Sequence, residues 1–115
     1  MLIRIDTGSA DPLYGQIAAQ FRHAIAHGEI APGVRLPAAK ELAAATGVNL
    51  HTVLRAYAEL RDAGLIELRP RRGAVVRPSG PVRARLTEQV RQLVESARLQ
   101  GLTKSEILEL VRSEL

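Results

Sequence analysis

Residues 38–64 read AAKELAAATGVNLHTVLRAYAELRDAG, and this stretch decides the fold. Its apolar residues recur at helical spacing, which predicts a helix over residues 38–46 that ends at Gly47. Asn49 is a favourable N-cap for a following helix over residues 50–63. Two helices joined by about three residues that include a glycine are typical of a helix-turn-helix.

The segments on either side complete a small domain. Upstream, Asp11 and Pro12 predict the start of a helix, as N-cap and first helical residue, and its apolar stripe runs to Gly28. Downstream, residues 65–77 contain the turn Pro70-Arg71-Arg72-Gly73 between two short apolar runs, which predicts a β-hairpin. Three helices followed by a hairpin predict a winged helix.

The chain therefore divides into three parts. Residues 1–77 are expected to form the winged helix-turn-helix DNA-binding domain, with an extended arm at residues 1–10. Residues 78–81, Pro-Ser-Gly-Pro, have the composition of a linker. Residues 82–115 show two amphipathic helical patterns, too short for a core of their own. The predicted fold class is mainly α with a small β-hairpin (α+β).

The apolar faces of the two C-terminal helices need a partner. Thr103 and Glu106 form a capping-box pattern that opens the last helix. A helical pair after a linker is most simply a dimerisation region, and packing on the chain's own winged domain is the alternative. The residues expected at the dimer contact are Leu86, Val90, Leu93, Val94, Ala97, Ile107, Leu108 and Val111.

Composition excludes several classes of protein. The 115 residues carry 16 Lys and Arg against 12 Asp and Glu, for a net charge of +4, and they include no cysteine. A disulfide framework and a thiolate metal site are therefore excluded. No apolar run approaches the ~20 residues of a membrane span, and the first residues do not resemble a signal peptide, so we expect a cytoplasmic protein.

The sequence gives no support for catalysis. It shows no Ser-His-acid arrangement, glycine-rich phosphate loop or paired carboxylates, so we expect neither an enzyme nor a cofactor. His23 and His27 have the spacing of a metal pair but lack a third ligand, and we interpret them as surface histidines with no metal. Three aromatic residues are too few for stacking on single-stranded nucleic acid.

Positive charge is concentrated at the expected hairpin tip and linker. Six arginines lie between Arg69 and Arg85, and no acidic residue interrupts them. Such a segment can meet backbone phosphates or a narrow minor groove, although a solvated turn is the alternative. Arg71 and Arg72, at the tip, are the first candidates for such contacts.

The second helix of the motif presents a polar side opposite its core stripe. At ~100° per residue, His51 and Arg55 lie about 160° and 200° from Val53. They would point into a major groove, where arginine can bind guanine. Asn49 and Thr52, at the helix start, suit phosphate oxygens, but capping and support of the first turn are the alternatives. The core stripe consists of Val53, Ala56, Tyr57 and Leu60.

The order of these motifs resembles the GntR family of bacterial transcription regulators over about residues 10–77. The C-terminal pattern is similar to the YtrA subfamily, whose members carry a short two-helix dimerisation region instead of a large effector-binding domain. The matching motifs are Pro12-Leu13-Tyr14-x-Gln16-Ile17, Gly28-x-Ile30-x-Pro32-Gly33-x-x-Leu36-Pro37, Glu41-Leu42-Ala43, Gly47-Val48-Asn49-x-x-Thr52-Val53-x-Arg55-Ala56-Tyr57-x-x-Leu60, Gly64-Leu65-Ile66, Gly101-Leu102-Thr103 and Glu106-Ile107.

The resemblance implies a homodimer that binds an inverted-repeat operator, often near transporter operons. The recognition helix would lie in the major groove and the wing in the minor groove. The resemblance places Lys40 at a DNA-backbone contact, and Gly73 at the glycine that lets the wing approach the groove. The sequence departs from the usual family residues at Ala38 (serine), Leu50 (arginine), Arg71 (glycine), Ala74 (threonine) and Val75 (an aromatic).

We therefore expect a sequence-specific, DNA-binding transcriptional regulator that represses by occupying its operator. A nonspecific architectural or RNA-binding winged helix is the alternative, and a protein-interaction module is disfavoured by the arginine-rich tip. No segment has the mass for an effector pocket, so any small-molecule effector would sit at a dimer interface. The expected DNA surface comprises Lys40, Asn49, His51, Thr52, Arg55, Arg71, Arg72 and Gly73.

Overall fold

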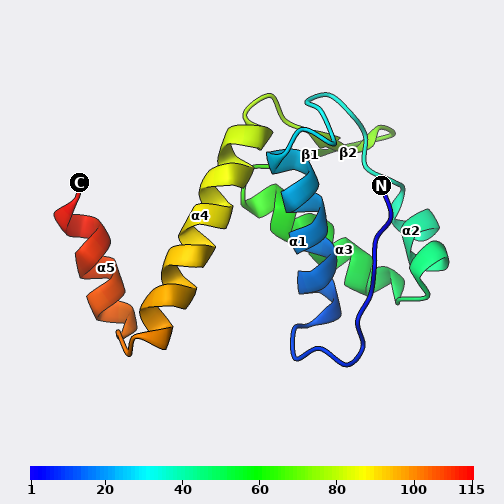
Figure 1. Cartoon of the computed structure of the whole chain (residues 1–115). Coiled ribbons are helices and arrows are strands. Elements are labelled where there is room, and N and C mark those ends of the chain that lie inside the picture. Colours follow the sequence, from blue (N-terminus) through cyan, green and yellow to red (C-terminus); the bar gives the residue numbers. More distant parts are fainter. The chain divides into compact units, whose positions relative to one another are not determined.

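A computed structural model describes all residues, 1–115, as five helices and one two-stranded antiparallel sheet (Figure 1). The predicted fold class, mainly α with a small hairpin, is confirmed. The chain forms two compact units, Met1–Arg85 and Leu86–Leu115. None of the helices is long and apolar enough to cross a lipid bilayer. The elements are α1 (Leu13–Ala26), α2 (Ala39–Thr46), α3 (Leu50–Asp62), β1 (Ile66–Arg69), β2 (Gly73–Val76), α4 (Gly80–Leu99) and α5 (Lys104–Ser113).

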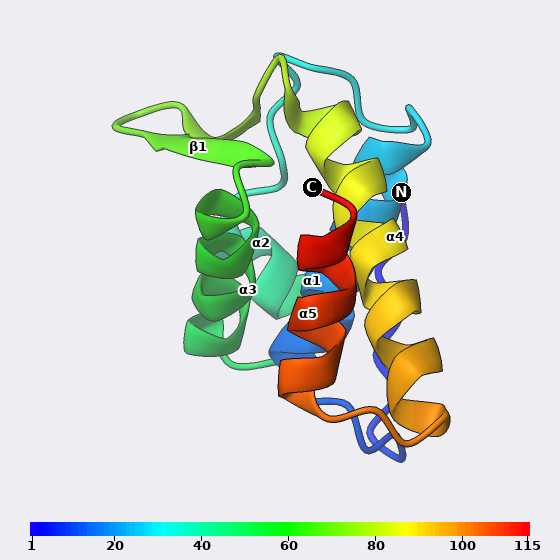
Figure 2. The ribbon, with the colours of Figure 1, turned by 90° about the vertical axis from the view of Figure 1, so that its left-hand side faces the viewer.

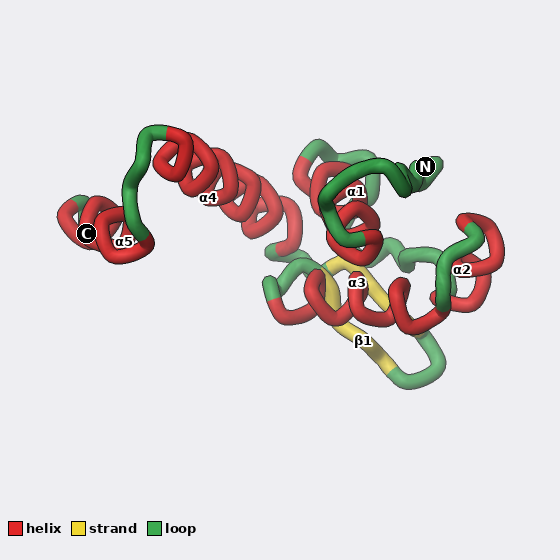
Figure 3. The backbone as a smooth tube through the Cα atoms, turned by 90° about the horizontal axis from the view of Figure 1, so that it is seen from below, coloured by secondary structure: helices red, strands yellow, loops and turns green.

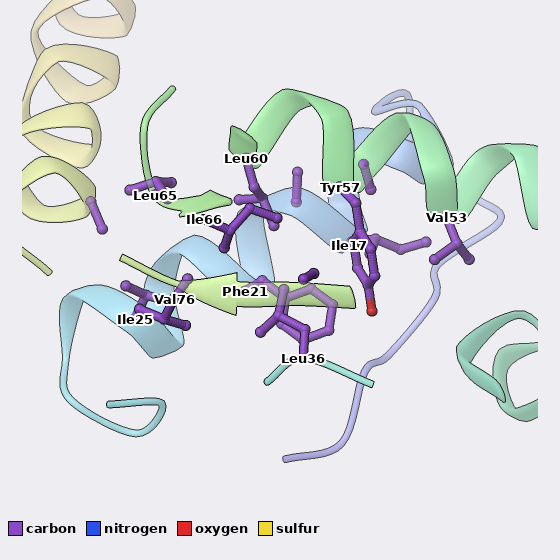
Figure 4. Packing of buried hydrophobic residues seen from close by; sticks show 14 of the residues in the cluster. Ile17, Phe21, Ile25, Leu36, Val53, Tyr57, Leu60, Leu65, Ile66 and Val76 are labelled. Atoms are coloured by element: carbon purple, nitrogen blue, oxygen red, sulfur yellow. The ribbon is translucent and has the colours of Figure 1, made fainter. Parts of the chain in front are cut away.

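The core of the first unit lies where α1, α3 and the hairpin meet (Figure 4). The rings of Phe21 and Tyr57 meet edge to face with 5.7 Å between their centroids, an arrangement that aromatic pairs favour. All four residues of the predicted α3 stripe are buried. The largest fully buried side chains are Phe21, Ile17, Ile25, Leu36, Leu60, Leu65, Ile66, Val53 and Val76.

Helices α2 and α3 form the predicted helix-turn-helix, and α3 packs against α1, α2 and β1 (Figure 3). Gly47 ends α2 with a φ of 73°, in the left-handed region that glycine adopts without a Cβ penalty. Asn49 is the N-cap of α3, as predicted, and its Oδ1 accepts a 2.8 Å hydrogen bond from the amide of His51. The two helices are therefore joined by a short and well-defined turn.

The hairpin has one face in the core, and its tip projects away from the helices (Figure 2). A short third segment joins it, since Arg35 pairs with Val75 and the amide of Leu36 donates to the carbonyl of Ala74 at 2.8 Å. This segment adds a single bridge to the edge of the two-stranded sheet. The hairpin pairs are Ile66 with Val76, Glu67 with Val75, Leu68 with Ala74 and Arg69 with Gly73.

Two glutamines of α1 hold residues 1–6 of the N-terminal arm in the extended form expected from the sequence, whereas residues 7–10, predicted as part of the same arm, form a turn. Gln20 accepts from the amide of Arg4 at 2.9 Å and donates to its carbonyl at 2.6 Å. Gln16 makes the same pair of bonds with Asp6, both at 2.9 Å. Glutamines four residues apart lie on one side of a helix, so their amides bind the arm as a neighbouring strand would.

The prediction that Asp11 caps α1 is wrong. The N-cap is Pro12, and no side chain caps the helix. The carbonyl of Asp11 instead accepts a 3.0 Å bond from the side chain of Gln16, so Asp11 belongs to the arm. The glutamine therefore bonds the chain just before the helix, and α1 begins one residue later than predicted.

Helix α4 begins at Gly80, inside the segment that the sequence predicted as a linker. Gly80 is buried, and a Cβ on it would lie only 2.8 Å from the carbonyl oxygen of Leu65. Ala84, one turn further along, is fully buried. The start of α4 therefore packs into the winged domain, because glycine and alanine leave room for close approach of the backbones.

The second unit contains the later turns of α4 and all of α5. Gly101 makes the turn between them with a φ of 86°. The predicted capping box is present, since Thr103 Oγ1 accepts from the amide of Glu106 at 3.2 Å and Glu106 Oε1 accepts from the amide of Thr103 at 3.1 Å. These bonds to Thr103 lower the pKa of Glu106. Ala97 and Ile107 are the buried residues of this unit.

Candidate nucleic-acid interface

The outward side of α3 carries four of the residues that the sequence singled out. His51 and Arg55 are exposed, as the helical angles predicted, and Thr52 is half-buried. Asn49 is exposed, and its side-chain oxygen caps the helix. Leu54, which lies between His51 and Arg55 in the sequence, is 44% exposed, although it is a large apolar residue. This side of α3 thus combines a cation, an imidazole and an apolar side chain.

Arg55 also has a partner that the sequence did not reveal. Its guanidinium lies over the ring of Tyr14 on α1, with 3.8 Å from the guanidinium carbon to the ring centroid. This is a cation–π contact, which limits the orientations that the arginine adopts. Tyr14 was part of the quoted motif Pro12-Leu13-Tyr14, but nothing in the spacing paired it with Arg55.

The start of α2 is open to a ligand. Lys40 is exposed, and the N-cap Ala38 offers no side-chain acceptor, so the first amides of the helix lack the cap that a serine would give. The loop before α2 is fixed by Tyr57, whose hydroxyl donates to the carbonyl of Pro37 at 2.6 Å. Burial raises the pKa of Tyr57.

A hollow of about 400 Å³ lies between the start of α2, the middle of α3 and the hairpin. Ala38 and Leu54 line it on the helical side, and Arg71, Arg72 and Gly73 line it on the hairpin side. Three residues predicted for the wing therefore share one concave surface with the helix-turn-helix. We call this surface the inner hollow.

The tip of the wing keeps its shape despite an unusual residue. Arg71 has a φ of 68° and Gly73 a φ of 75°, both in the left-handed region. Nothing would lie within 4 Å of a Cβ on Gly73, so conformation and not space is what favours glycine there. Arg71 occupies the position where the resemblance expects a glycine, and its conformation costs about 1–2 kcal/mol.

The six arginines of the basic stretch fall into two groups. Arg83 Nε donates to the carbonyl of Ala63 at the end of α3, at 3.0 Å, and Arg85 Nη1 donates to the carbonyl of Ala26 at the end of α1, at 3.2 Å. These two arginines bond the carboxyl ends of helices, where cations are favourable. The basic surface of the hairpin is therefore narrower than the sequence indicated, and consists of Arg69, Arg71, Arg72 and Arg77.

One of these hairpin arginines is paired with an acid. Arg69 Nε bonds Glu67 Oε1 on the same strand, and this bond lowers the pKa of Glu67. Sequence reasoning missed a further cation, Arg35, which is exposed and pairs with Val75 at the edge of the hairpin. The alternation Val34-Arg35-Leu36 was the available signal.

The residues predicted for dimerisation differ in burial. Ala97 and Ile107 are 6% and 9% exposed within their own unit. Val94 is half-buried. The exposed ones are Leu86, Val90, Leu93, Leu108 and Val111.

On α1, His23 and His27 are exposed side chains whose ring centroids lie 4.1 Å apart.

Comparison with known proteins gives consistent matches. The profile of the family described as bacterial regulatory proteins, gntR family, matches residues 13–76. The chain is 36% identical over 106 residues to the HTH-type transcriptional regulator Rv1152 of Mycobacterium tuberculosis, a match that covers 92% of this chain and 88% of that protein. It is 32% identical over 117 residues to the HTH-type transcriptional repressor YtrA of Bacillus subtilis, covering 96% and 90%.

A solved structure agrees with these sequence matches. YtrA from Sulfolobus acidocaldarius, a GntR-family transcription factor, superposes with a TM-score of 0.64 at 36% identity. The match covers 96% of this chain and 94% of that one. The likeness therefore extends along the whole chain and includes the short C-terminal unit.

Proposed function

Because this chain belongs to the GntR family of bacterial transcription regulators, we propose that it is a homodimeric repressor that binds an inverted-repeat operator. The YtrA-type relatives match nearly its full length and place it in the YtrA subfamily. The chain is a DNA-binding transcription regulator and not an enzyme.

The main structural support for this proposal is the inner hollow. It joins the start of α2, the exposed Leu54 of α3 and the arginines of the wing in one concave surface, beside the outward side of α3 that carries His51 and Arg55. A duplex presents a groove flanked by two phosphate backbones, and contacts to both fix its register. An α3 in the major groove would leave Arg71 and Arg72 beside the neighbouring backbone or minor groove.

We assign base recognition to the outward side of α3. Arg55 and His51 are exposed there, and a guanidinium can donate two bonds to a guanine edge. The exposed Leu54 suits contact with a thymine methyl group. Asn49 and Thr52 lie at the helix start, where amides and short polar groups favour phosphate oxygens.

We assign phosphate contacts to Lys40 and to the tip of the wing. Lys40 is exposed on the first turn of α2, beside uncapped amides that favour an anion. Arg71 and Arg72 are exposed at the tip, and Gly73 lets the backbone turn there without a side chain. Contacts of this kind strengthen binding to every sequence.

The second unit supports dimerisation. Leu86, Val90 and Leu108 are each more than half exposed, although large apolar side chains are normally buried by a folded chain. A second copy would cover them in a two-fold contact and present two α3 helices to two half-sites.

Repression is the simplest outcome of such binding. A dimer on an operator blocks other proteins from the same DNA without any further domain. The Bacillus subtilis relative is named a transcriptional repressor. We place the protein in the cytoplasm, where the DNA is, and propose that the family's association with transporter operons applies to it.

Selection of bound sites from a pool of random duplexes at about 150 mM salt tests the proposal, because nonspecific binding is weak there. We expect enrichment of an inverted repeat with half-sites about one helical turn apart. Binding without enrichment that vanishes as salt rises would overturn the proposal and favour a nonspecific architectural protein. Preference for double-stranded RNA over DNA would equally contradict it.

A further inference from the structure

The hairpin has a second basic surface, of which the proposed recognition of DNA uses only Arg72. A hollow of about 560 Å³ lies along it, and four of its lining residues are arginines: Arg35, Arg69, Arg72 and Arg77. Glu67 is the only acidic residue that lines it. We call this surface the outer hollow.

Strand register explains why these side chains gather. Glu67 pairs with Val75, and Arg35 pairs with Val75 from the other side, so all three share one face. Residues two apart on a strand also share a face, which adds Arg69 and Arg77. Ile66, Ala74 and Val76 occupy the opposite face and are buried in the core.

The outer hollow keeps a positive charge in spite of Glu67. The bond from Arg69 holds the pKa of that carboxyl below its usual value, so Glu67 is ionised and neutralises one arginine. Four arginines against one carboxylate leave the surface with an excess of three positive charges, although Glu67 also attracts Arg77. A surface of this charge suits a row of phosphates.

The two hollows share three residues of the hairpin region, since Arg35, Arg69 and Arg72 line both. A duplex bound at the inner hollow would therefore have these three arginines of the outer hollow near its backbone.

We propose that the outer hollow binds the phosphate backbone of the duplex that flanks each operator half-site, independently of sequence. The inference rests on the proposed function, because it needs an operator to set the register. Arg35 and Arg77 supply the outermost contacts, and Glu67 limits their strength. The flanks thereby add affinity that the operator sequence alone does not account for.

Two duplexes test this, one ending at the selected inverted repeat and one extended on both sides by about one turn of unrelated sequence. Affinity is measured by fluorescence anisotropy over a range of salt concentrations. We expect wild type to bind the longer duplex more tightly and with a steeper salt dependence. Arg77→Gln should lose part of this gain and leave binding to the short duplex nearly unchanged, because Arg77 lines only the outer hollow. Its salt slope on the long duplex should fall by about one.

Two further variants make the test specific. Glu67→Gln removes the acid and releases Arg69, so it should increase the gain from the flanks, a change that mere damage to the hairpin would not produce. Arg61→Gln removes the same charge at an exposed site of α3 outside both hollows and should behave as wild type.

The result separates the two proposals. Equal gains from the flanks in wild type, Arg77→Gln and Glu67→Gln would overturn this inference while specific binding to the short duplex still supports the proposed function. A shift of the Arg77 side-chain NMR signal by inorganic phosphate, with no effect of the flanks, would point to a small anion and equally overturn it. Failure to prefer the operator at all would overturn both.

Discussion

The guanidinium of Arg55 rests on the ring of Tyr14, 3.8 Å from its centroid, and so joins the recognition helix to the first turn of α1. Arg55 is nevertheless exposed, so it stays accessible to a base or phosphate. An arginine that is already oriented loses less side-chain freedom on binding than a mobile one. The contact therefore makes α1 a supporting element of the proposed base recognition.

Replacing Tyr14 should weaken operator binding through Arg55. Tyr14→Leu removes the ring and should reduce affinity by about two- to fivefold, the equivalent of an exposed cation–π contact. Tyr14→Phe keeps the ring and should bind within about twofold of wild type. In the Arg55→Ala background the Tyr14→Leu effect should disappear. An equal loss in both backgrounds would show that Tyr14 acts without Arg55.

Arg55→Ala itself should remove sequence preference. If Arg55 binds a base, its removal should reduce the binding free energy by about 1–3 kcal/mol for the best operator and by much less for unrelated DNA. Titration of the variant against the operator and single-base variants of it measures both quantities. An unchanged ranking of these sites would contradict base recognition by Arg55.

Substitutions at Arg71 should separate backbone strain from charge. Arg71→Ala and Arg71→Gly both remove a phosphate contact and should reduce the salt slope of DNA binding by about one. Only Arg71→Gly relieves the positive φ, so it should be about 1 kcal/mol more stable than Arg71→Ala. Urea unfolding compares the two. Equal stability would show that the tip changes conformation to suit its residue.

The stability of the winged domain should depend on the protonation of Tyr57. Burial raises its pKa above the ordinary value of about 10, so at high pH the hydroxyl ionises first in the unfolded chain. The contribution of the Tyr57 hydroxyl to the free energy of unfolding is fully present below about pH 10. It is lost as the pH rises toward the pKa that the hydroxyl has in the folded protein.

Tyr57→Phe isolates this contribution. The substitution removes the 2.6 Å hydrogen bond to the Pro37 carbonyl. It should therefore lower the free energy of unfolding by about 1 kcal/mol near pH 8. The difference from wild type should shrink when urea unfolding is repeated above about pH 10. A difference that stays constant with pH would contradict this role of the hydroxyl.

Elements set by local patterns were predictable from the sequence. Gly47, Asn49 and the Thr103–Glu106 capping box act within one turn of their own backbone, so their residue types alone define helix ends. The outward positions of His51 and Arg55 followed from the helical period in the same way.

Features that join distant segments were not predictable. The contact of Arg55 with Tyr14 depends on tertiary packing that no spacing encodes. The alternation Val34-Arg35-Leu36 indicates an extended segment, but it does not say that Arg35 lies beside Val75. The same holds for Arg83, which the run of arginines grouped with the wing but which bonds the end of α3. Charge clusters in a sequence thus overestimate charge clusters on a surface when arginines can reach helix carbonyls.

The exposed apolar residues of the second unit make oligomeric state the decisive test of how operator binding is organised. Val90→Asp and Leu108→Asp each place a charge on an exposed apolar position and should dissociate a dimer that buries it. Gln89→Asp changes charge at the neighbouring exposed position of α4 and should leave the dimer intact. Sedimentation velocity measures the oligomeric state, and the affinity for two duplexes, one with a single half-site and one with both, measures its effect on DNA binding. A monomeric variant should bind these two duplexes with the same affinity, because it cannot contact two half-sites at once. If both apolar variants remain dimeric, another surface joins the protomers, and the exposed leucines of α4 and α5 require a different partner.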